Sequence, residues 1–155
     1  MIRRPLLVTT PVVAVCLLAA CAGGPPGPAT LDVGRQPCDH CRMTVSDARF
    51  AAQLVAPGEE PRFFDDLGCL TAYLRDQADL PSAAVAYVAD HRTGDWVRAA
   101  AAVYTRVAAL ATPMGSHLVA HGSEASREGD PAAREGVAVA ASEMFGPAGP
   151  PGGAR

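Results

Sequence analysis

Residues 49–74 read RFAAQLVAPGEEPRFFDDLGCLTAYL, and this stretch decides the fold. Segment 49–55 is rich enough in apolar residues for a strand, and the Pro and Gly residues of 56–61 indicate a turn. Segment 62–64 then fits the returning strand. The pattern therefore predicts two neighbouring strands joined by a short loop.

A helix is expected directly after the second strand. Asp65 can cap its first turn, and three leucines fall at i, i+3 and i+7 on one helical face. These leucines are Leu67, Leu70 and Leu74. We expect the helix to end near Asp79, because Pro81 cannot continue it.

The rest of the chain carries weaker signals. A third strand is expected at 84–90, and weaker strand candidates lie at 96–97 and 103–107. A last helix is expected at 132–144, directly behind a proline. Strands and helices that alternate without long hydrophobic runs predict a small α+β domain. The sequence shows no recognisable second copy of the first strand-strand-helix-strand unit.

The composition limits both the size and the partners of the protein. The chain has 155 residues, which is room for one domain, and 49% of them are apolar but only 5% aromatic, so the core must be modest. The 13 basic residues are all Arg and are outnumbered by 16 acidic residues, for a net charge of −3. A nucleic-acid partner is therefore not expected, because phosphate binding needs a basic surface.

Residues 1–20 have the pattern of an export signal. Arg3 and Arg4 precede an apolar stretch, and the tetrapeptide Leu-Ala-Ala-Cys at 18–21 resembles a bacterial lipobox. We therefore expect a lipoprotein signal peptide at 1–20 and a lipidated Cys21 that carries fatty chains such as palmitate. A membrane-spanning helix is not favoured, since it needs about 20 uninterrupted apolar residues. The protein is then expected in the cell envelope, anchored to a membrane by lipid and facing the periplasm.

The chain on either side of the expected domain is poor in side chains that can pack. Segment 21–37 begins with the lipidated cysteine and is rich in Gly and Pro, so we expect a flexible linker. Segment 146–155 is nearly all Gly, Pro and Ala and is expected to be a disordered tail. The folded domain is therefore expected at 38–145.

Three cysteines follow the lipidated one: Cys38, Cys41 and Cys69. An exported protein that depended on disulfides would pair all of its cysteines, so an odd number indicates at least one free or metal-ligating thiol. The alternative is a disulfide between Cys38 and Cys41, with Cys69 buried as a small apolar residue. For Cys69, a place in the helix interior is favoured over a ligand role.

The segment Cys38-Asp-His-Cys-Arg-Met43 carries the clearest metal-binding chemistry. Two thiols three positions apart can converge on one ion, and the thioether of Met43 lies on the same short loop. Soft sulfur donors favour Cu(I). Met114 lies between two turn formers, Pro113 and Gly115, and is therefore expected on a loop, where ligands collect. The competing interpretation is that both methionines fill the core.

Six blocks of the chain resemble the NosL family in their order and spacing. The blocks are CDHCRM (38–43), DARFAAQ (47–53), FDDLGC (64–69), YVAD (87–90), DW (95–96) and TPMG (112–115). NosL proteins are lipoprotein copper chaperones of nitrous-oxide reductase maturation. The resemblance implies two small strand-strand-helix-strand units, Cu(I) as the bound ion, and delivery to nitrous-oxide reductase with the help of its membrane maturation complex.

The resemblance also implies ligands by position. Cys41 and Met43 match the family's Cys-x-Met element, and Met114 matches its Pro-Met-Gly block. The chain departs from the family where Arg42 replaces a frequent Gly and where His117 replaces a small residue, which changes the expected loop geometry. The complete set of predicted metal ligands is Cys38, Cys41, Met43 and Met114.

Two other functions compete with a copper chaperone. A thiol-disulfide oxidoreductase could use Cys38 and Cys41, with Thr112-Pro113 imitating a cis-proline loop, but such enzymes place the cysteine pair at a helix start after a strand, and no such strand is recognisable. A structural zinc module lacks an evident fourth ligand. The sequence contains no recognisable catalytic triad or phosphate loop, so a non-enzymatic metallochaperone is predicted. His91 and His121 have no partner that the sequence identifies.

Overall fold

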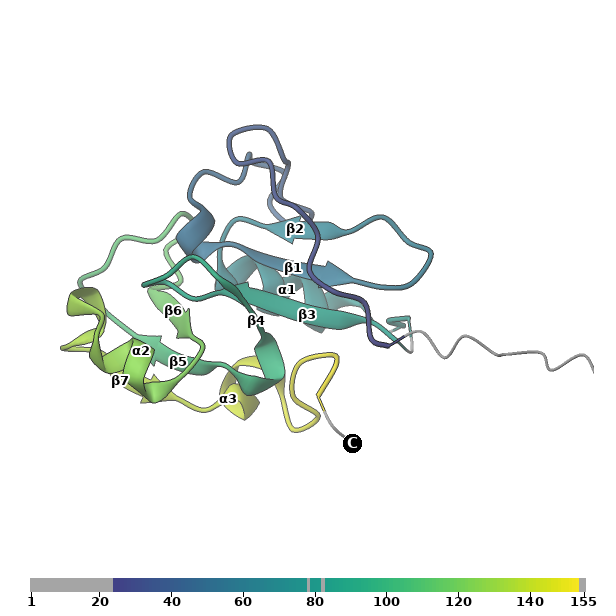
Figure 1. Cartoon of the computed structure of the whole chain (residues 1–155). Helices are drawn as coiled ribbons and strands as arrows, with labels where there is room; N and C mark the ends of the chain where they lie inside the picture. Colours follow the sequence, from purple (N-terminus) through teal and green to yellow (C-terminus); the bar gives the residue numbers. More distant parts are fainter. Residues whose placement is uncertain (1–23, 78, 82, 154–155) are drawn as a thin grey trace, which may run out of the picture.

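Two small antiparallel sheets form the fold (Figure 1). The computed structural model describes residues 24–153 except residues 78 and 82. The first sheet has the strand order β2-β1-β3-β4, and the second has the order β6-β5-β7. The elements are β1 (Ala52–Val55), β2 (Arg62–Phe64), α1 (Leu67–Asp76), β3 (Val85–Ala89), β4 (Trp96–Arg98), β5 (Val103–Arg106), β6 (Leu118–His121), α2 (Glu124–Glu128), β7 (Val137–Val139) and α3 (Ala141–Phe145).

The two sheets follow the same chain path. In the first unit, β1, β2, α1 and β3 succeed one another, and β1 lies between β2 and β3. In the second unit, β5, β6, α2 and β7 repeat this order, and β5 lies between β6 and β7. The structure therefore confirms an α+β domain of two strand-strand-helix-strand units, although the units share no recognisable sequence repeat.

Helix α1 is fixed to the first sheet by its cap and by two leucines. Asp66, rather than the expected Asp65, is the N-cap, because its carboxylate accepts a hydrogen bond from a backbone N–H of the first turn. Leu67 and Leu70 are buried in the core. Burial of a leucine side chain contributes about 1.5–3 kcal/mol, so these two residues hold the helix in place. The helix ends at Asp76, earlier than expected.

One hydrophobic cluster contains residues of both units. Phe64 and Val88 come from the first sheet, and Tyr104 comes from the second. The sheets also meet through their backbones, because the N–H of His91, just after β3, donates to the carbonyl oxygen of Ala120 in β6 (2.9 Å). The two units therefore form one packed body.

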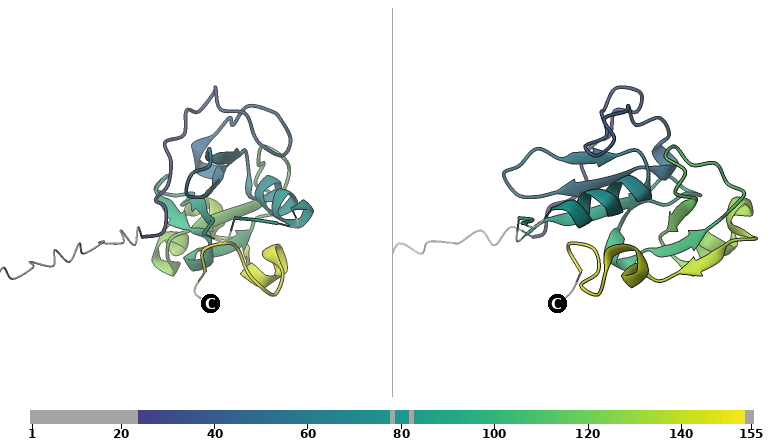
Figure 2. Two further views of the ribbon diagram at one scale, coloured as in Figure 1. Left: turned by 90° about the vertical axis from the view of Figure 1, so that its right-hand side faces the viewer. Right: turned by 180° about the vertical axis from the view of Figure 1, so that it is seen from behind.

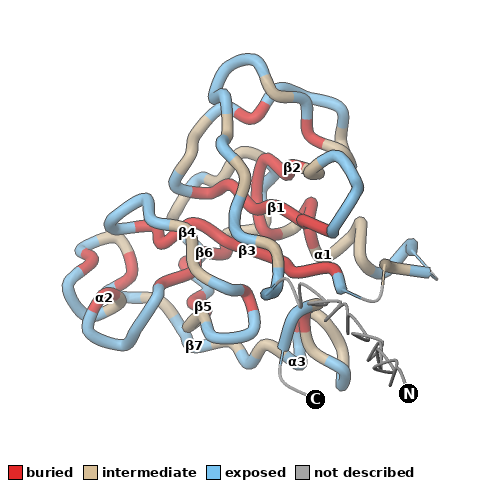
Figure 3. Tube along the Cα trace, turned by 45° about the vertical axis from the view of Figure 1, so that its right-hand side comes forward, coloured by how far each residue is buried: buried red, intermediate tan, exposed pale blue. Residues whose placement is uncertain are grey.

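Both faces of the first sheet are covered, so every residue of β1 and β3 is buried (Figure 3). Helix α1 lies on one face, and segment 24–37 crosses the other (Figure 2). On this second face the N–H of Ala29 donates to Oε1 of Gln53 (2.7 Å), and Nε2 of Gln53 donates to the Ala29 carbonyl oxygen (3.2 Å). Leu31 packs nearby, in the cluster that contains Phe63.

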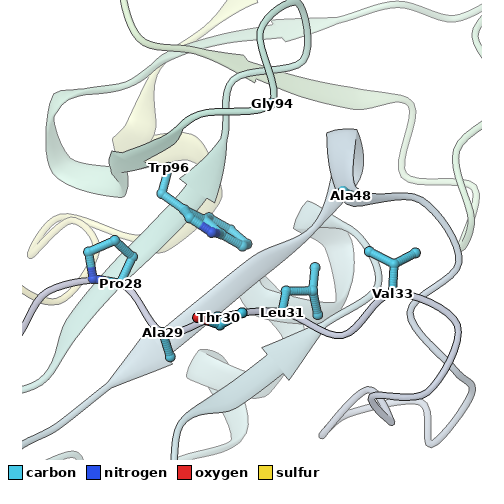
Figure 4. Close-up of a pocket in the computed structure, with 8 residues that line it drawn as sticks. All are labelled: Pro28, Ala29, Thr30, Leu31, Val33, Ala48, Gly94 and Trp96. Carbon is cyan, nitrogen blue, oxygen red and sulfur yellow. The ribbon is translucent and has the colours of Figure 1, made fainter.

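The structure thus differs from the expected flexible linker at 21–37. Its described part is held to the sheet because a buried glutamine offers both a donor and an acceptor to the backbone of residue 29. Residues 28–31 and Val33 also line an open surface pocket of about 370 Å³ beside Trp96 and Ala48 (Figure 4). A Gly- and Pro-rich composition did not prevent this segment from packing.

The C-terminal part differs most from the sequence prediction. The helix expected at 132–144 is wrong, because a 3-10 turn at Pro131–Ala133, strand β7 and the short helix α3 take its place. Gly136 gives the physical reason: a Cβ there would lie 2.3 Å from Cγ2 of Thr105, so the chain enters β7 in close contact with β5. The local sequence pattern did not locate strand β6 or helix α2, although the family resemblance implied a second unit that contains such elements.

The last residues also pack against the domain. The carbonyl oxygen of Pro151 accepts a hydrogen bond from the N–H of Ala86 in β3 (3.0 Å), and Pro150 is buried. The described part of segment 146–155 therefore differs from the disordered tail that its composition predicts.

The expected signal peptide at 1–20 and the expected lipidation site Cys21 lie outside the described residues. Within the part of the chain that the structure describes, none of the helices has both the length and the apolar character needed to cross a membrane.

Candidate metal centre

Three free thiols converge at the start of α1. Cys38 and Cys41 lie on the loop before β1, and Cys69 lies in the first turn of α1. The sulfur atoms of the three residues all lie within 4.8 Å of one another. Cys38 and Cys69 are buried, whereas Cys41 is half-buried, so the cluster is closed on the core side and opens to solvent at Cys41.

The cysteine loop has a fixed backbone. The N–H of Cys38 donates to the carbonyl oxygen of Met43 (2.7 Å), and the N–H of Arg42 donates back to the carbonyl oxygen of Cys38 (3.0 Å). Asp39 attaches the loop to β2, because its N–H donates to the carbonyl oxygen of Phe63 (2.8 Å) and its carboxylate accepts from the N–H of Phe63 (2.9 Å). These bonds place the first two thiols next to the helix that carries the third.

Two adjacent buried aspartates tie α1 to its surroundings. Oδ1 of Asp65 accepts hydrogen bonds from the backbone N–H (2.8 Å) and the hydroxyl (3.2 Å) of Ser46, just beyond the cysteine loop. Oδ1 of Asp66 caps the N–H of Cys69 (3.0 Å). The pair is therefore occupied in holding the site together.

Asp66 also binds the loop that carries Met114. Its Oδ2 accepts hydrogen bonds from the N–H of Met114 (3.1 Å) and from the hydroxyl of Thr112 (3.1 Å). The loop touches the helix closely, since a Cβ on Gly68 would lie 2.9 Å from Cβ of Ser116. The second unit therefore brings Met114 to the same helix start as Cys69.

The predicted ligands thus have different environments. Cys38 and Cys41 are brought together with Cys69, which the sequence analysis had assigned to the helix interior. The side chains of Met43 and Met114 are 55% and 41% exposed, so neither methionine fills the core. Cys69 lies in the helix and in the thiol cluster at once, and no local sequence signal distinguishes it from a cysteine that only fills the core.

Electrostatics distinguish the three thiols. A hydrogen bond from the Cys69 thiol, aided by backbone hydrogen bonds and opposed by burial, lowers the pKa of Cys38 from 9.0 to about 5. The hydrogen bond to Cys38 and burial raise the pKa of Cys69, and burial raises the pKa of Cys41. These shifts favour the thiolate, the form of cysteine that binds metals, at Cys38 over the other two thiols.

The two departures from the family pattern coincide with unusual backbone geometry. Arg42 and His117 have φ angles of 67° and 57° and are the non-glycine residues with positive φ among those described. This left-handed conformation favours glycine, which explains why small residues suit both loops. The ring of His117 lies with its Nδ1 2.8 Å from the carbonyl oxygen of Leu110, so this nitrogen is engaged within its own loop.

One comparison with known proteins, the scan against protein families, gave a match. Searches of curated proteins and of solved structures found none. The NosL family model matches residues 28–145, which is more than half of the chain and contains both loops of the site. The chain therefore belongs to the NosL family.

Proposed function

We propose that this protein is a membrane-tethered metallochaperone that binds Cu(I) through sulfur ligands and delivers it for assembly of the copper centres of nitrous-oxide reductase. The observation that carries the proposal is the convergence of three free thiols, Cys38, Cys41 and Cys69. Membership of the NosL family supports copper as the cargo and supports nitrous-oxide reductase and its membrane maturation complex as the partners.

The donor set favours Cu(I) over zinc. Thiolates and thioethers are soft ligands, and Cu(I) is the soft ion among the first-row metals. Structural zinc sites almost always have four ligands in a tetrahedron. Among the described residues, the group that contains the three thiols includes no fourth Cys, His, Asp or Glu. A site of three thiols, with Met43 on the cysteine loop and Met114 on the loop bound to the start of α1, therefore suits Cu(I).

The exposure of the site suits transfer of the ion. Cys38 and Cys69 close the core side, and Cys41, Met43 and Met114 face the solvent. Ligands of a partner protein could approach from this open side and replace exposed sulfur atoms one at a time. Binding would release protons from the thiols that are still protonated, so loading and release are coupled to proton exchange.

Metal analysis of the purified, untagged protein under reducing conditions tests the proposal. With copper and zinc both offered, we expect about one Cu(I) per chain, because the sulfur donors outcompete water and carboxylates for a soft ion. Stoichiometric zinc without retained copper would contradict the proposal and would favour a structural zinc module.

The thiol environments argue against the alternative oxidoreductase. A catalytic dithiol needs an accessible thiolate that can attack a substrate disulfide. Here the thiol with the lowered pKa, Cys38, is fully buried, and the more accessible Cys41 has a raised pKa. The more accessible thiol is therefore not the one whose pKa is lowered. This arrangement suits a set of metal ligands better than a redox-active pair of cysteines.

The tether can be tested independently of the copper site. If Cys21 is lipidated, Cys21→Ser should release a soluble protein with unchanged Cu(I) affinity, because the anchor precedes the segment that packs on the sheet. Delivery in cells should still decline, since a tethered chaperone meets its membrane partners more often. Fractionation of cells and Cu(I) competition measure the two effects, and loss of Cu(I) binding in the purified variant would show that the anchor region contributes to the site.

A further inference from the structure

A second cluster of metal-binding side chains, separate from the thiols, lies where the two units meet. His91 follows β3, His121 ends β6, and Asp130 follows α2. One oxygen of Asp130, Oδ2, lies 2.6 Å from Nδ1 of His91 and 2.9 Å from Nε2 of His121. One ligand atom from each of the three residues lies within 4.8 Å of the others.

The cluster is closed to solvent. His91, His121 and Asp130 are 5%, 0% and 5% exposed. The ring of Phe50 packs against that of His91, with the ring centroids 5.0 Å apart. Three polar side chains are therefore enclosed in the interior of a small domain whose apolar core is modest.

Hydrogen bonding within the cluster does not satisfy these side chains. Nε2 of His91 and Nδ1 of His121 are buried and have no hydrogen-bond partner among the described residues. Burial of a polar atom without a partner is unfavourable, and a partly satisfied network is less stable than an apolar core. Packing alone does not require a histidine at position 121. In the first unit, Phe64 occupies the equivalent position, two residues before the N-cap of the helix. Phe64 is a fully buried apolar ring.

We propose that His91, His121 and Asp130 bind a borderline divalent cation of the Zn²⁺ type, at a site separate from the thiol cluster. Two imidazoles and one carboxylate are ligands that zinc commonly uses, and the hard carboxylate makes the set unsuited to Cu(I). This assignment does not depend on the copper role of the thiols.

The distances fit an ion that takes the place of the two shared protons, while each proton moves to the other nitrogen of its own imidazole ring. Ligands at 2.0–2.1 Å from a tetrahedral zinc ion lie about 3.3 Å apart, so the two N–O distances have to lengthen from 2.6 and 2.9 Å to about 3.3 Å. An ionised Asp130 carboxylate would supply negative charge to the ion.

The experiment separates the two sites by filling the thiols first. The full-length protein is loaded with one equivalent of Cu(I) and titrated with Zn²⁺ against a competing chelator, while ¹⁵N-histidine NMR follows the ring nitrogens. We expect one further Zn²⁺ per chain, with shifts confined to two of the 4 histidines, those of His91 and His121. Because the NMR signals come from the unmodified protein, they report zinc at these rings whether or not the thiols retain copper.

Variants assign the ligands. His121→Phe introduces phenylalanine, the residue type at the equivalent position of the first unit, Phe64. This variant should weaken Zn²⁺ binding on the order of 100-fold or more. Its Cu(I) binding should be unchanged. Asp130→Asn should also lose the ion and keeps the size of the side chain. The control His40→Asn changes an exposed histidine and should bind Zn²⁺ as the parent does. No uptake beyond the thiol site, or shifts at His40 or His117 instead, would overturn the proposal.

Discussion

Cys69→Ser should weaken Cu(I) binding on the order of 100-fold or more while the domain stays folded. Serine has nearly the size of cysteine, and its hydroxyl can still donate the hydrogen bond that Cys38 receives, so this hydrogen bond and the helix start are preserved. What the variant loses is a soft ligand in the buried part of the cluster. Competition with a Cu(I) chelator measures the affinity, and circular dichroism checks the fold.

Cys21→Ser provides the control, because it removes the proposed lipid anchor and none of the proposed ligands. Its affinity should equal that of the parent protein. If Cys69→Ser held Cu(I) as tightly as this control, Cys69 would be only a small buried residue of α1. The ligand set would then return to the one predicted from the sequence, with Cys38 and Cys41 as the thiols.

Met43→Leu and Met114→Leu should each abolish tight Cu(I) binding and support no maturation of nitrous-oxide reductase. Leucine keeps the size and apolarity of methionine, and both side chains are largely exposed, so the free energy of unfolding should change by less than about 1.5 kcal/mol. Thioethers take no part in thiol-disulfide exchange, so the reactivity of the cysteines in the metal-free protein should stay nearly the same. Chelator competition, thiol labelling and reductase activity in cells measure these three effects.

Met144→Leu is the control for this pair, since Met144 is a buried core methionine outside both loops of the site. It should bind Cu(I) and support maturation as the parent does. If both loop variants also bound Cu(I) as tightly as the parent, the thioethers would not be ligands, and a site of thiols alone, or a redox role, would become the better interpretation.

The proposed copper site depends on both units, because Asp66 links the start of α1 to the loop that carries Met114. Asp66 accepts hydrogen bonds from the first turn of α1 and from the loop before β6 with the same carboxylate. A change in the packing of the second unit would therefore move Met114 relative to Cys69. This coupling gives the second unit a role in the site even though its own helix, α2, carries Ser126 at the position equivalent to Cys69.

The sequence by itself determined the elements whose signals are local. The turn residues of 56–61 and the leucine spacing of α1 predicted the first unit within a few residues. The Cys-x-x-Cys-x-Met run placed two thiols and a thioether on one short loop, because neighbours in the chain are necessarily close in space. The same local reasoning failed for residues 132–144, where contact with β5 overrode helix propensity.

Only the tertiary structure decided which distant residues meet. Cys69 joins Cys38 because backbone hydrogen bonds hold the cysteine loop on β2, beside the start of α1. His91 meets Asp130, 39 residues later, because the second unit packs its β6 and α2 against the end of β3. Such contacts depend on how the two sheets, which share no sequence repeat, pack together. Neither the hydrophobic periodicity nor the spacing of residues along the chain predicts that packing.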